Sequence, residues 1–428
     1  MSPSVGTVRL TEDDLAAVDA RLADADAARV SAYPGDRTDR QPVHTVYVPA
    51  DRFVAQGGPD LPAAWGAEAT AALARHAPRA DDLARACDLD VEEVREVWGA
   101  VVAKLETEPV EDLRVDLEDG YGTRSDEEED ADALAAGRAL GAAVGAGTCP
   151  PFVGIRFKSL EGSTRRRGLR SLDLVLGEVL GAGDLPPGWT VTLPKVTSVD
   201  QVEAFVDVCG RLEAAYGLAE GRLTFEVQVE TPQAILLADG TAGVARMVHS
   251  AAGRCTGLHF GTYDYSAALG ISGGQQALDH PVADHAKQVM QLAAAGTGVR
   301  VSDGSTNIVP VGDAHAVHAA WALHARLVRR SLGRGLYQGW DLHPAQLPTR
   351  FVATYLFFRT GLGRVGERLR RYLARDEGGV LDEPATAQAL AAFLLRGVHC
   401  GAVSADEVAD LTGTDLTTVA GLAARRVG

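Results

Sequence analysis

Alternation of apolar and polar positions along the chain predicts a series of short strands separated by helices. Each apolar, β-branched run is followed by an Ala- and Leu-rich stretch with helical spacing, such as "DQVEAFVDVCGRLEAAYG". Eight strands that alternate with helices predict an α/β protein built as a (β/α)8 (TIM) barrel, with a doubly wound open sheet as the alternative. The eight runs are "HTVYVPAD" (44–51), "LRVDLEDG" (113–120), "FVGIRFKS" (152–159), "WTVTLPKV" (189–196), "LTFEVQVET" (223–231), "CTGLHFGTYD" (255–264), "GVRVSDG" (298–304) and "LYQGWDLHP" (336–344).

Three regions lie outside this alternation. Residues 1–43 predict an N-terminal helical segment, and residues 52–111 predict a helical insertion after the first strand of a barrel that spans 44–346. Residues 347–428 predict a C-terminal helical region that serves as a lid or in oligomerisation. The segments "RADDLARACDLDVEEVREVW" and "SADEVADLTGTDLTTVAGL" each predict two helices around a tight turn. Neither has a basic face, so we interpret both as plain helical hairpins rather than DNA-reading motifs.

Composition narrows the class of protein. Lysine and arginine total 41 against 58 acidic residues, a net charge of −17, which disfavours nucleic acid or an anionic membrane as the main partner. Five cysteines lie far apart without CxxC spacing, so neither a zinc knuckle nor a disulfide framework is indicated. The N-terminus has no apolar signal core, and the chain has no run of eighteen apolar residues. We therefore expect a reduced cytoplasmic protein.

Ionisable residues follow seven successive predicted strands. The stretch "LTFEVQVETPQAI" shows the pattern, because a carboxylate, Glu230, stands at the end of a strand that proline terminates. Catalytic groups of a barrel project from the C-terminal ends of its strands, so we expect these side chains at one mouth. They are Asp116, Glu118 and Asp119 (strand 2), Arg156 and Lys158 (strand 3), Lys195 (strand 4), Glu230 (strand 5), Asp264 (strand 6), Asp303 (strand 7) and His343 (strand 8).

Glu230 and Asp264 predict a metal site. Adjacent strands lie about 4.8 Å apart, so these two carboxylates are expected to converge. Without a nearby histidine or cysteine cluster they suit a hard cation, Mg²⁺ with Mn²⁺ as the alternative, which leaves coordination positions for water and substrate. A 2-oxo acid or an enolate would then chelate the ion.

The motifs around these residues resemble those of the HpcH/HpaI aldolase and citrate lyase beta-subunit family, which includes malyl-CoA lyases. "VDLEDGYG" is similar to the strand-2 signature, and Arg138 lies downstream where an Ala-Arg pair usually follows. "GIRFKS" and "LPKV" resemble the strand-3 and strand-4 motifs and bear Arg156 and Lys195. "VETPQAIL" and "FGTYDYSAALG" resemble the segments that carry the two metal carboxylates, and "DLHPAQL" resembles Ile-His-Pro-x-Gln.

The resemblance implies a Mg²⁺-dependent carbon–carbon lyase or aldolase that acts through a metal-stabilised enolate. Its substrate would be a small carboxylate: a 2-oxo acid, a hydroxy acid or a coenzyme A thioester. The implied catalytic residues are Arg156, Lys195 and, in a C-terminal lid segment, Asp382; a helix N-cap is the other interpretation of Asp382. Relatives are trimers or hexamers, so a homo-oligomer is expected, with the aromatic run "FVATYLFFR" as a candidate interface. Further substrate-binding candidates are Glu118, Asp119, Arg165, Arg166 and Arg167.

Alternatives stay open for the arginines and for the reaction. "STRRRGLR" is either a clamp for coenzyme A or another polyanion, or a solvated loop that pairs with acidic residues. Lys195 also allows a Schiff-base aldolase, because a lysine on a barrel strand can form an imine. A non-catalytic barrel with a binding or regulatory role is the third hypothesis.

Overall fold

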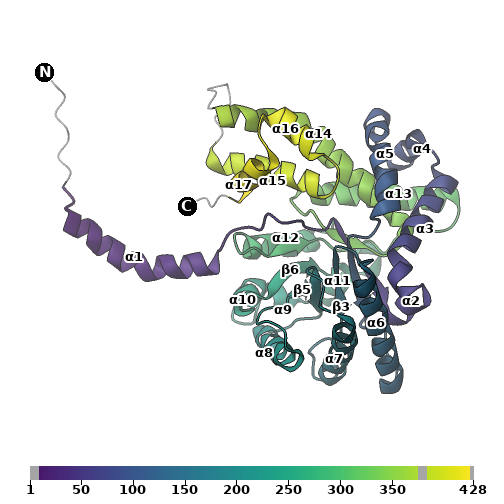
Figure 1. The fold of residues 1–428 in the computed structure, drawn as a ribbon, viewed down its shortest axis with the longest axis horizontal. Coiled ribbons are helices and arrows are strands. Elements are labelled where there is room, and N and C mark those ends of the chain that lie inside the picture. Colours follow the sequence, from purple (N-terminus) through teal and green to yellow (C-terminus); the bar gives the residue numbers. More distant parts are fainter. Residues whose placement is uncertain (1–8, 375–382, 425–428) are drawn as a thin grey trace.

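A closed parallel barrel forms the body of the protein, as a computed structural model that describes residues 9–374 and 383–424 shows (Figure 1). The strand order is β7-β6-β5-β4-β3-β2-β1-β8. A parallel bridge between Ser302 and Gln338 joins the two edges, and the amide of Asp303 donates to the carbonyl of Gln338 at 2.8 Å. The predicted (β/α)8 barrel is thus confirmed, and the open-sheet alternative is wrong. The strands are β1 (His44–Pro49), β2 (Asp112–Asp116), β3 (Phe152–Arg156), β4 (Trp189–Leu193), β5 (Phe225–Val229), β6 (Cys255–Phe260), β7 (Arg300–Ser302) and β8 (Gly339–Asp341).

Helices between the strands cover the outside of the barrel. Their starts follow from the sequence: Ser125 and Ser198 cap α6 and α8 by accepting hydrogen bonds from backbone amides three residues later. The acidic run after Ser125 lies in the first turn of α6, where it complements the helix dipole. These elements are α6 (Asp126–Ala146), α7 (Arg165–Ala182), α8 (Val199–Tyr216), α9 (Pro232–Ile235), α10 (Gly243–Ser250), α11 (Thr262–Ala268), η2 (Gly273–Gln275), α12 (Pro281–Ala294) and α13 (Ala314–Gly333).

The predicted insertion and C-terminal extension are both helical and pack against each other through α5 and α14, while α4 packs against α13 of the barrel. The two segments predicted as helical hairpins form the pairs α4–α5 and α16–α17. The insertion comprises α2 (Ala50–Ala55), η1 (Gly58–Asp60), α3 (Leu61–His76), α4 (Ala80–Cys87) and α5 (Val91–Thr107). After η3 (Pro344–Gln346), the extension comprises α14 (Leu347–Ala374), α15 (Pro384–His399), α16 (Ala405–Thr412) and α17 (Leu416–Ala423).

The aromatic run "FVATYLFFR" lies in α14 and packs mostly inside the protomer. Phe351, Tyr355 and Phe358 are buried, whereas Phe357 is half-buried. The run therefore joins α14 to the rest of the molecule, and Phe357 is its apolar side chain with the most surface left for an outside contact.

Charged side chains fill the middle of the barrel. Arg114 forms an ion pair of 3.0 Å with Glu226, which also lies 3.0 Å from Nε2 of His259. Tyr47 donates from its hydroxyl to Glu226 at 3.3 Å, and all four residues are buried. Because buried charges are stable when they are paired, this network forms a rigid polar floor below the barrel mouth.

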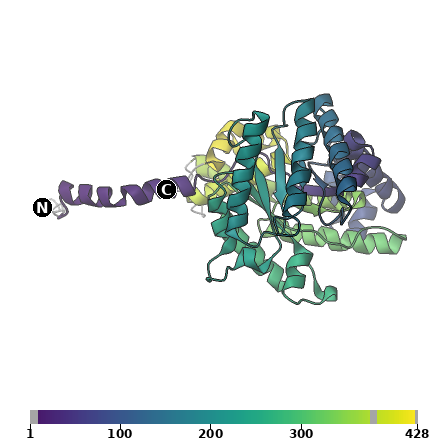
Figure 2. The same cartoon turned by 90° about the horizontal axis from the view of Figure 1, so that it is seen from below.

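An N-terminal helix, α1 (Glu12–Ala32), projects away from the barrel and the C-terminal helices in both views (Figures 1 and 2). Among the described residues, no helix combines the length and apolar character that crossing a membrane requires.

Candidate active site

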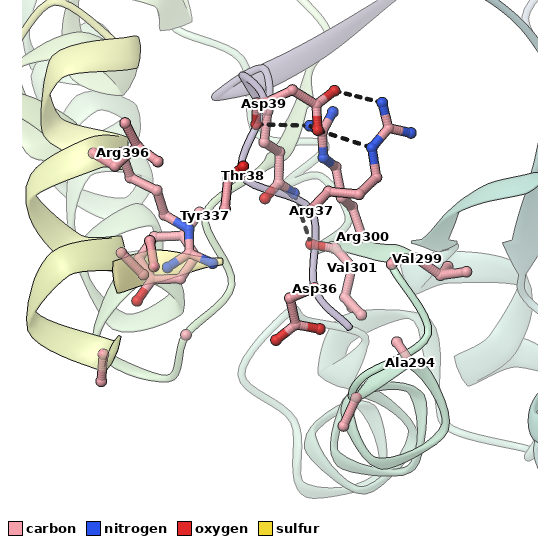
Figure 3. Close-up of a pocket in the computed structure, with 18 of the residues that line it drawn as sticks. Asp36, Arg37, Thr38, Asp39, Ala294, Val299, Arg300, Val301, Tyr337 and Arg396 are labelled. Carbon is pink, nitrogen blue, oxygen red and sulfur yellow. Dashed lines mark hydrogen bonds and ion pairs between the residues drawn. The ribbon is translucent and has the colours of Figure 1, made fainter. Parts of the chain in front are cut away.

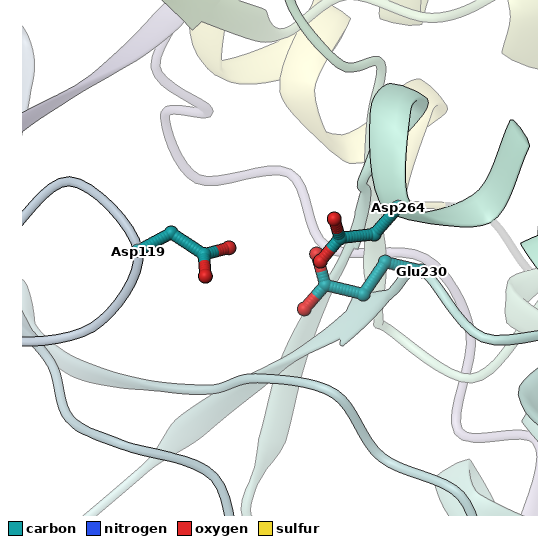
Figure 4. Close-up of side chains that lie close together, drawn as sticks. All are labelled: Asp119, Glu230 and Asp264. Carbon is teal, nitrogen blue, oxygen red and sulfur yellow. The ribbon is translucent and has the colours of Figure 1, made fainter. Parts of the chain in front are cut away.

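Three carboxylates meet at the C-terminal mouth of the barrel (Figure 4). Asp119 follows β2, Glu230 follows β5 directly, and Asp264 lies in the first turn of α11 after β6. One oxygen from each lies within 4.8 Å of the others. Glu230 is buried, while the side chains of Asp119 and Asp264 are 52% and 48% exposed, so the group opens toward solvent. The two predicted metal residues therefore lie together, and Asp119 joins them.

A glycine makes room for Glu230. The parallel register pairs Val229 with Phe260, so Gly261 lies directly beside Glu230. A Cβ at Gly261 would lie 2.4 Å from Cβ of Glu230, closer than atoms can approach without a shift. The amide of Gly261 also donates to the carbonyl of Val229 at 2.9 Å. The "FGTYD" sequence thus fixes both carboxylates, because its glycine accommodates one and its aspartate is the other.

The "DLEDG" turn is built around the carboxylate of Asp116. Its Oδ1 accepts the amide of Glu118 at 3.0 Å, and its Oδ2 accepts the amide of Gly120 at 2.9 Å. The amide of Asp119 in turn donates to Oε2 of Glu118 at 2.7 Å. Burial raises the pKa of Glu118 to about 7, against the lowering effect of Arg156. The turn thus presents Glu118 and Asp119 together to the barrel mouth.

Lys195 lies among the carboxylates. Its Nζ is 2.7 Å from Asp119 and 3.2 Å from Glu118, and it also pairs with Asp264. Its backbone amide donates to Oε1 of Glu230 at 2.9 Å. Burial disfavours the ammonium ion, but the surrounding carboxylates, Glu230 first, outweigh burial and hold the pKa of Lys195 above its usual value.

The backbone of Lys195 is left-handed, with a φ of 50° that non-glycine residues seldom adopt. Such a conformation costs on the order of 1–3 kcal/mol and persists where surrounding contacts enforce it. Here the contacts of its amide and ammonium groups with carboxylates provide that enforcement.

Carboxylates outnumber cations around Glu230. Burial, with smaller contributions from Glu118 and Asp264, raises the pKa of Glu230 to about 8, although Lys195 and Arg156 act to lower it. Lys195 and Arg156 together pair with four other carboxylates: Asp116, Glu118, Asp119 and Asp264. Oxygen ligands in this number and arrangement, without histidine or cysteine among them, fit a hard divalent cation.

Arg156 is held rigidly beside the carboxylates. Its Nε and Nη2 donate to the two oxygens of Asp116, each at 2.7 Å, and its Nη1 donates to Gln228 at 3.2 Å. The guanidinium lies 4.7 Å from the centre of the Tyr47 ring and is 3.7 Å from Glu118. We predicted that the guanidinium of Arg156 binds a substrate carboxylate. In the structure, two of its nitrogens bind Asp116, and the third, Nη1, faces Gln228 and Glu118.

Three other strand-end residues have their partners outside the group of three carboxylates. Lys158 pairs with Glu129 on α6 at 2.8 Å, and Asp303 pairs with Lys287 on α12 at 3.0 Å. His343 caps η3 and lies 3.6 Å from Glu68. Arg138 lies outside the barrel, on α6, 3.3 Å from Glu178.

The arginine-rich stretch forms the start of α7 rather than a loop. Arg167 pairs with Asp130 and lies 3.4 Å from Glu129, Arg165 donates to the carbonyl of Leu160 at 2.9 Å, and Arg166 is exposed. Arginine has a high helix propensity, but its positive charge is unfavourable at the N-terminus of a helix. The acidic residues in the first turn of α6 offset this effect by pairing with Arg167. A clamp role for these three residues stays a prediction. Asp382 lies outside the described residues.

The sequence did not predict which side chains hold Arg156 and Glu230 in place. Gln228 connects Arg156 to Glu230, because its side-chain amide also donates to Glu230. The period-2 alternation of β5 contains a signal for this contact, since Gln228 and Glu230 share a face. Tyr47 and Asp116 are inward positions of their strands, but their pairing with Arg156 depends on the closure of the barrel.

Comparisons with known proteins agree with this architecture. A family model described as "Domain of unknown function (DUF6986)" matches residues 22–427. No curated protein sequence matches the chain. A malate synthase of Haloferax volcanii, solved as a lead(II) complex, superimposes with a TM-score of 0.50 at 16% identity, over 85% of this chain and 90% of that one. At this identity the likeness shows a shared fold.

Two weaker matches come from Mycobacterium tuberculosis. CitE, in complex with magnesium, acetoacetate and coenzyme A, gives a TM-score of 0.47 at 18% identity over 88% of this chain and 100% of that one. The citrate lyase beta subunit, in complex with oxaloacetate and magnesium, gives a TM-score of 0.42 at 20% identity over 73% of this chain and 96% of that one. Both proteins bear names of the group that the motifs resemble.

Proposed function

The chain belongs to the family described as Domain of unknown function (DUF6986), and we propose that this member is a Mg²⁺-dependent carbon–carbon lyase or aldolase. One observation carries the proposal: Asp119, Glu230 and Asp264 converge at the C-terminal mouth of the barrel, where barrel enzymes hold their catalytic groups. Lys195 and Arg156 surround these carboxylates with fixed positive charge. The motifs that contain the five residues resemble those of the citrate lyase beta-subunit family in the same order along the chain.

Glu230 and Asp264, with Asp119 as a third ligand, would hold Mg²⁺ or Mn²⁺. Such an ion supplies a Lewis acid that stabilises negative charge on a substrate oxygen by several kcal/mol. Making or breaking a carbon–carbon bond beside a carbonyl group places negative charge on that oxygen. The donor set thus suits this reaction class.

Arg156 provides the positive charge expected to orient a substrate carboxylate. Asp116 and Tyr47 fix its guanidinium from two sides, so the side chain loses little freedom when a substrate binds. Its Nη1 contacts a neutral amide, Gln228, and lies 3.7 Å from Glu118. A substrate carboxylate could therefore compete for this nitrogen without breaking the pair with Asp116.

Lys195 holds its proton at Nζ and adds a second positive charge beside the reacting oxygen. This protonation speaks against the Schiff-base alternative, because an imine forms from a neutral amine, and the surrounding carboxylates raise the pKa of Lys195. Borohydride in the presence of pyruvate separates the mechanisms: we expect no covalent adduct, and a stable adduct on Lys195 by mass spectrometry would establish the Schiff base.

The substrate is proposed to be a small carboxylate: a 2-oxo acid, a hydroxy acid or a coenzyme A thioester. The test is a screen of pyruvate, oxaloacetate, glyoxylate, acetyl-CoA and malyl-CoA for bond formation or cleavage, with and without Mg²⁺. Turnover that requires the metal and disappears in Asp264→Asn would support the proposal. Metal binding without turnover on any of these compounds would instead favour the non-catalytic barrel.

A further inference from the structure

The N-terminal helix α1 is well formed but has no packing partner in the protomer. Thr11 caps it with a complete capping box, and three acidic residues, Glu12, Asp13 and Asp14, complement the dipole of its first turn. Yet every residue from Glu12 to Ser31 is exposed. An isolated helix is at best marginally stable in water, and most helices in proteins depend on packing of one face.

The base of α1 is fixed to the barrel, so the helix is held out from the body. The amide of Gly35 donates to the carbonyl of Gly296 at 2.8 Å. Asp39 pairs with both Arg37 and Arg300, beside a cavity of about 440 Å³ between the linker, β7 and α15 (Figure 3). Arg40 binds Glu108 and Glu111 at 2.7 and 2.8 Å. Because the linker is anchored at several points, a partner for α1 is expected from outside the protomer.

One side of α1 combines apolar and acidic residues. Leu15, Val18 and Leu22 follow helical spacing and are 44%, 53% and 47% exposed. Asp19 and Asp26 each follow one of the leucines by four residues and lie beside this stripe. The helix as a whole carries six acidic residues against Arg21 and Arg29.

A groove that combines apolar and basic residues lies between the helical insertion and the C-terminal helices. It has a volume of about 1050 Å³ and lies between α4, α13, α14 and α15. Apolar side chains line it: Leu323, Leu356, Phe357, Val365 and Phe393. Its charged lining is predominantly basic, with four arginines against Asp88 and Glu93: Arg326, Arg329, Arg330 and Arg364.

Two of the four arginines that line the groove are not neutralised by a carboxylate of the described residues. Arg326 pairs with Asp279 and Arg330 pairs with Asp284, both at the protomer's own surface. Arg329 and Arg364 are exposed and, within residues 9–374 and 383–424, have no carboxylate partner. In a chain with a net charge of −17, such a basic lining is unusual and complements an acidic helix.

We propose that α1 of one copy of this chain binds in the groove between α4, α13, α14 and α15 of a second copy. Leu15, Val18 and Leu22 would cover the apolar floor, in the manner of an amphipathic helix in a hydrophobic groove. Asp19 and Asp26 would face the lining that includes Arg329 and Arg364. The contact gives α1 its missing packing and covers Phe357, the half-buried residue of the aromatic run.

Light scattering and sedimentation of the full chain test the proposal. We expect the wild-type protein to be oligomeric at micromolar concentration. L15E/L22E on α1 and R329E/R364E at the groove should each weaken association at least tenfold. A20E/A27E adds the same charge to the opposite side of α1, and Arg211→Glu reverses an exposed charge on α8; both controls should keep the wild-type mass.

Mixing the two defective variants identifies the pairing. L15E/L22E keeps an intact groove and R329E/R364E keeps an intact α1, so a mixed complex should form although neither variant associates alone. A monomeric wild type would overturn the proposal, and so would an oligomer whose mass L15E/L22E leaves unchanged. Dissociation by L15E/L22E alone, with R329E/R364E unaffected, would mean that α1 pairs elsewhere and would equally overturn it.

Discussion

At the scale of single residues, the mouth of the barrel is a balance of opposing charges. Lys195 and Arg156 pair with Asp116, Glu118, Asp119 and Asp264, so two cations face four carboxylates beside Glu230. Burial outweighs these cations and raises the pKa of Glu230 to about 8. A site that contained charges for structural reasons would pair them fully. The excess negative charge here matches a site that receives a further cation.

Removing either predicted ligand should therefore abolish metal binding without unfolding the protein. Glu230→Gln and Asp264→Asn keep the size of the side chain but remove the charge, so we expect calorimetry to show Mg²⁺ affinity reduced at least tenfold. Circular dichroism should stay native. Asp207→Asn, at an exposed position of α8, is the matched control. Unchanged affinity in both site variants would refute the metal assignment.

Arg156→Lys separates fixed geometry from charge alone. Lysine keeps the charge but cannot reproduce two parallel donors to Asp116 while a third nitrogen faces Gln228. Losing one charge-assisted hydrogen bond costs about 1.5–3 kcal/mol, or roughly ten- to a hundredfold in kcat/KM at about 1.4 kcal/mol per factor of ten. We expect that loss in steady-state kinetics, with Mg²⁺ affinity retained; near-normal turnover would contradict the role.

The sequence predicted which residue types gather at the mouth better than it predicted their pairings. Glu230, Lys195 and Asp264 lie one, two and four residues beyond the ends of their strands and come together at the barrel mouth, as the rule for strand ends predicts. Lys158 and Asp303 also lie just beyond strand ends, but they pair with Glu129 on α6 and Lys287 on α12 instead. Side-chain direction beyond a strand depends on packing that a single sequence does not contain.

At the scale of elements, close approach of neighbouring strands controls the site. Gly261→Ala would place a methyl group 2.4 Å from Cβ of Glu230 and displace its carboxylate. We therefore expect Mg²⁺ affinity to fall at least tenfold by calorimetry although no ligand is removed. Gly210→Ala in α8, where a Cβ meets no atom within 4 Å, should leave affinity unchanged. Normal binding by Gly261→Ala would show that β5 and β6 can move apart at little cost.

A buried ion pair connects β8 to the helices around it. Asp341 accepts from Arg350 on α14 at 2.8 Å and lies 3.0 Å from His324 on α13. Burial opposes ionisation of Asp341, but Arg350, His324 and His44 outweigh it and hold its pKa well below the usual value. Removing one partner leaves a buried charge uncompensated, so Asp341→Asn should lower the free energy of unfolding by about 3–5 kcal/mol.

The pH dependence of that loss follows from the lowered pKa of Asp341. A carboxylate with a lowered folded-state pKa stabilises fully above its unfolded pKa of about 3.9 and loses this contribution as the pH falls further. Urea unfolding should thus show a constant difference between wild type and Asp341→Asn from pH 7 to pH 5. The difference should shrink below about pH 4; a difference that grows there would contradict the assignment.

At the scale of the whole molecule, the sequence predicted the barrel, its insertion and its helical extension, because eight strand–helix units leave few other folds. It did not predict that the insertion and extension contact each other, since α5 and α14 lie far apart along the chain and meet only after the barrel closes. Nor did it predict the polar barrel interior around Arg114 and Glu226. Both features arise from long-range packing.

This packing gives one large core, on which the last prediction rests. A cluster of buried apolar residues extends from Val43 before the barrel to Ala423 in α17, and a small second cluster, which includes Ala353, lies between α13 and α14. Phe351 lies inside it, 5.5 Å from the His44 ring of β1 and with Nζ of Lys104 on α5 5.5 Å from its own ring centre.

Phe351→Ala should therefore destabilise barrel, insertion and extension together, by about 3–5 kcal/mol for a large buried aromatic residue. Calorimetry should show one transition in the wild type and one, at lower temperature, in the variant. Leu373→Ala, at a more exposed position of the same helix, is the control and should shift the transition little. If the C-terminal helices melted separately while the barrel kept its transition temperature, the core would consist of two cooperative units, and contacts across α5 and α14 would contribute little to the stability of the barrel mouth.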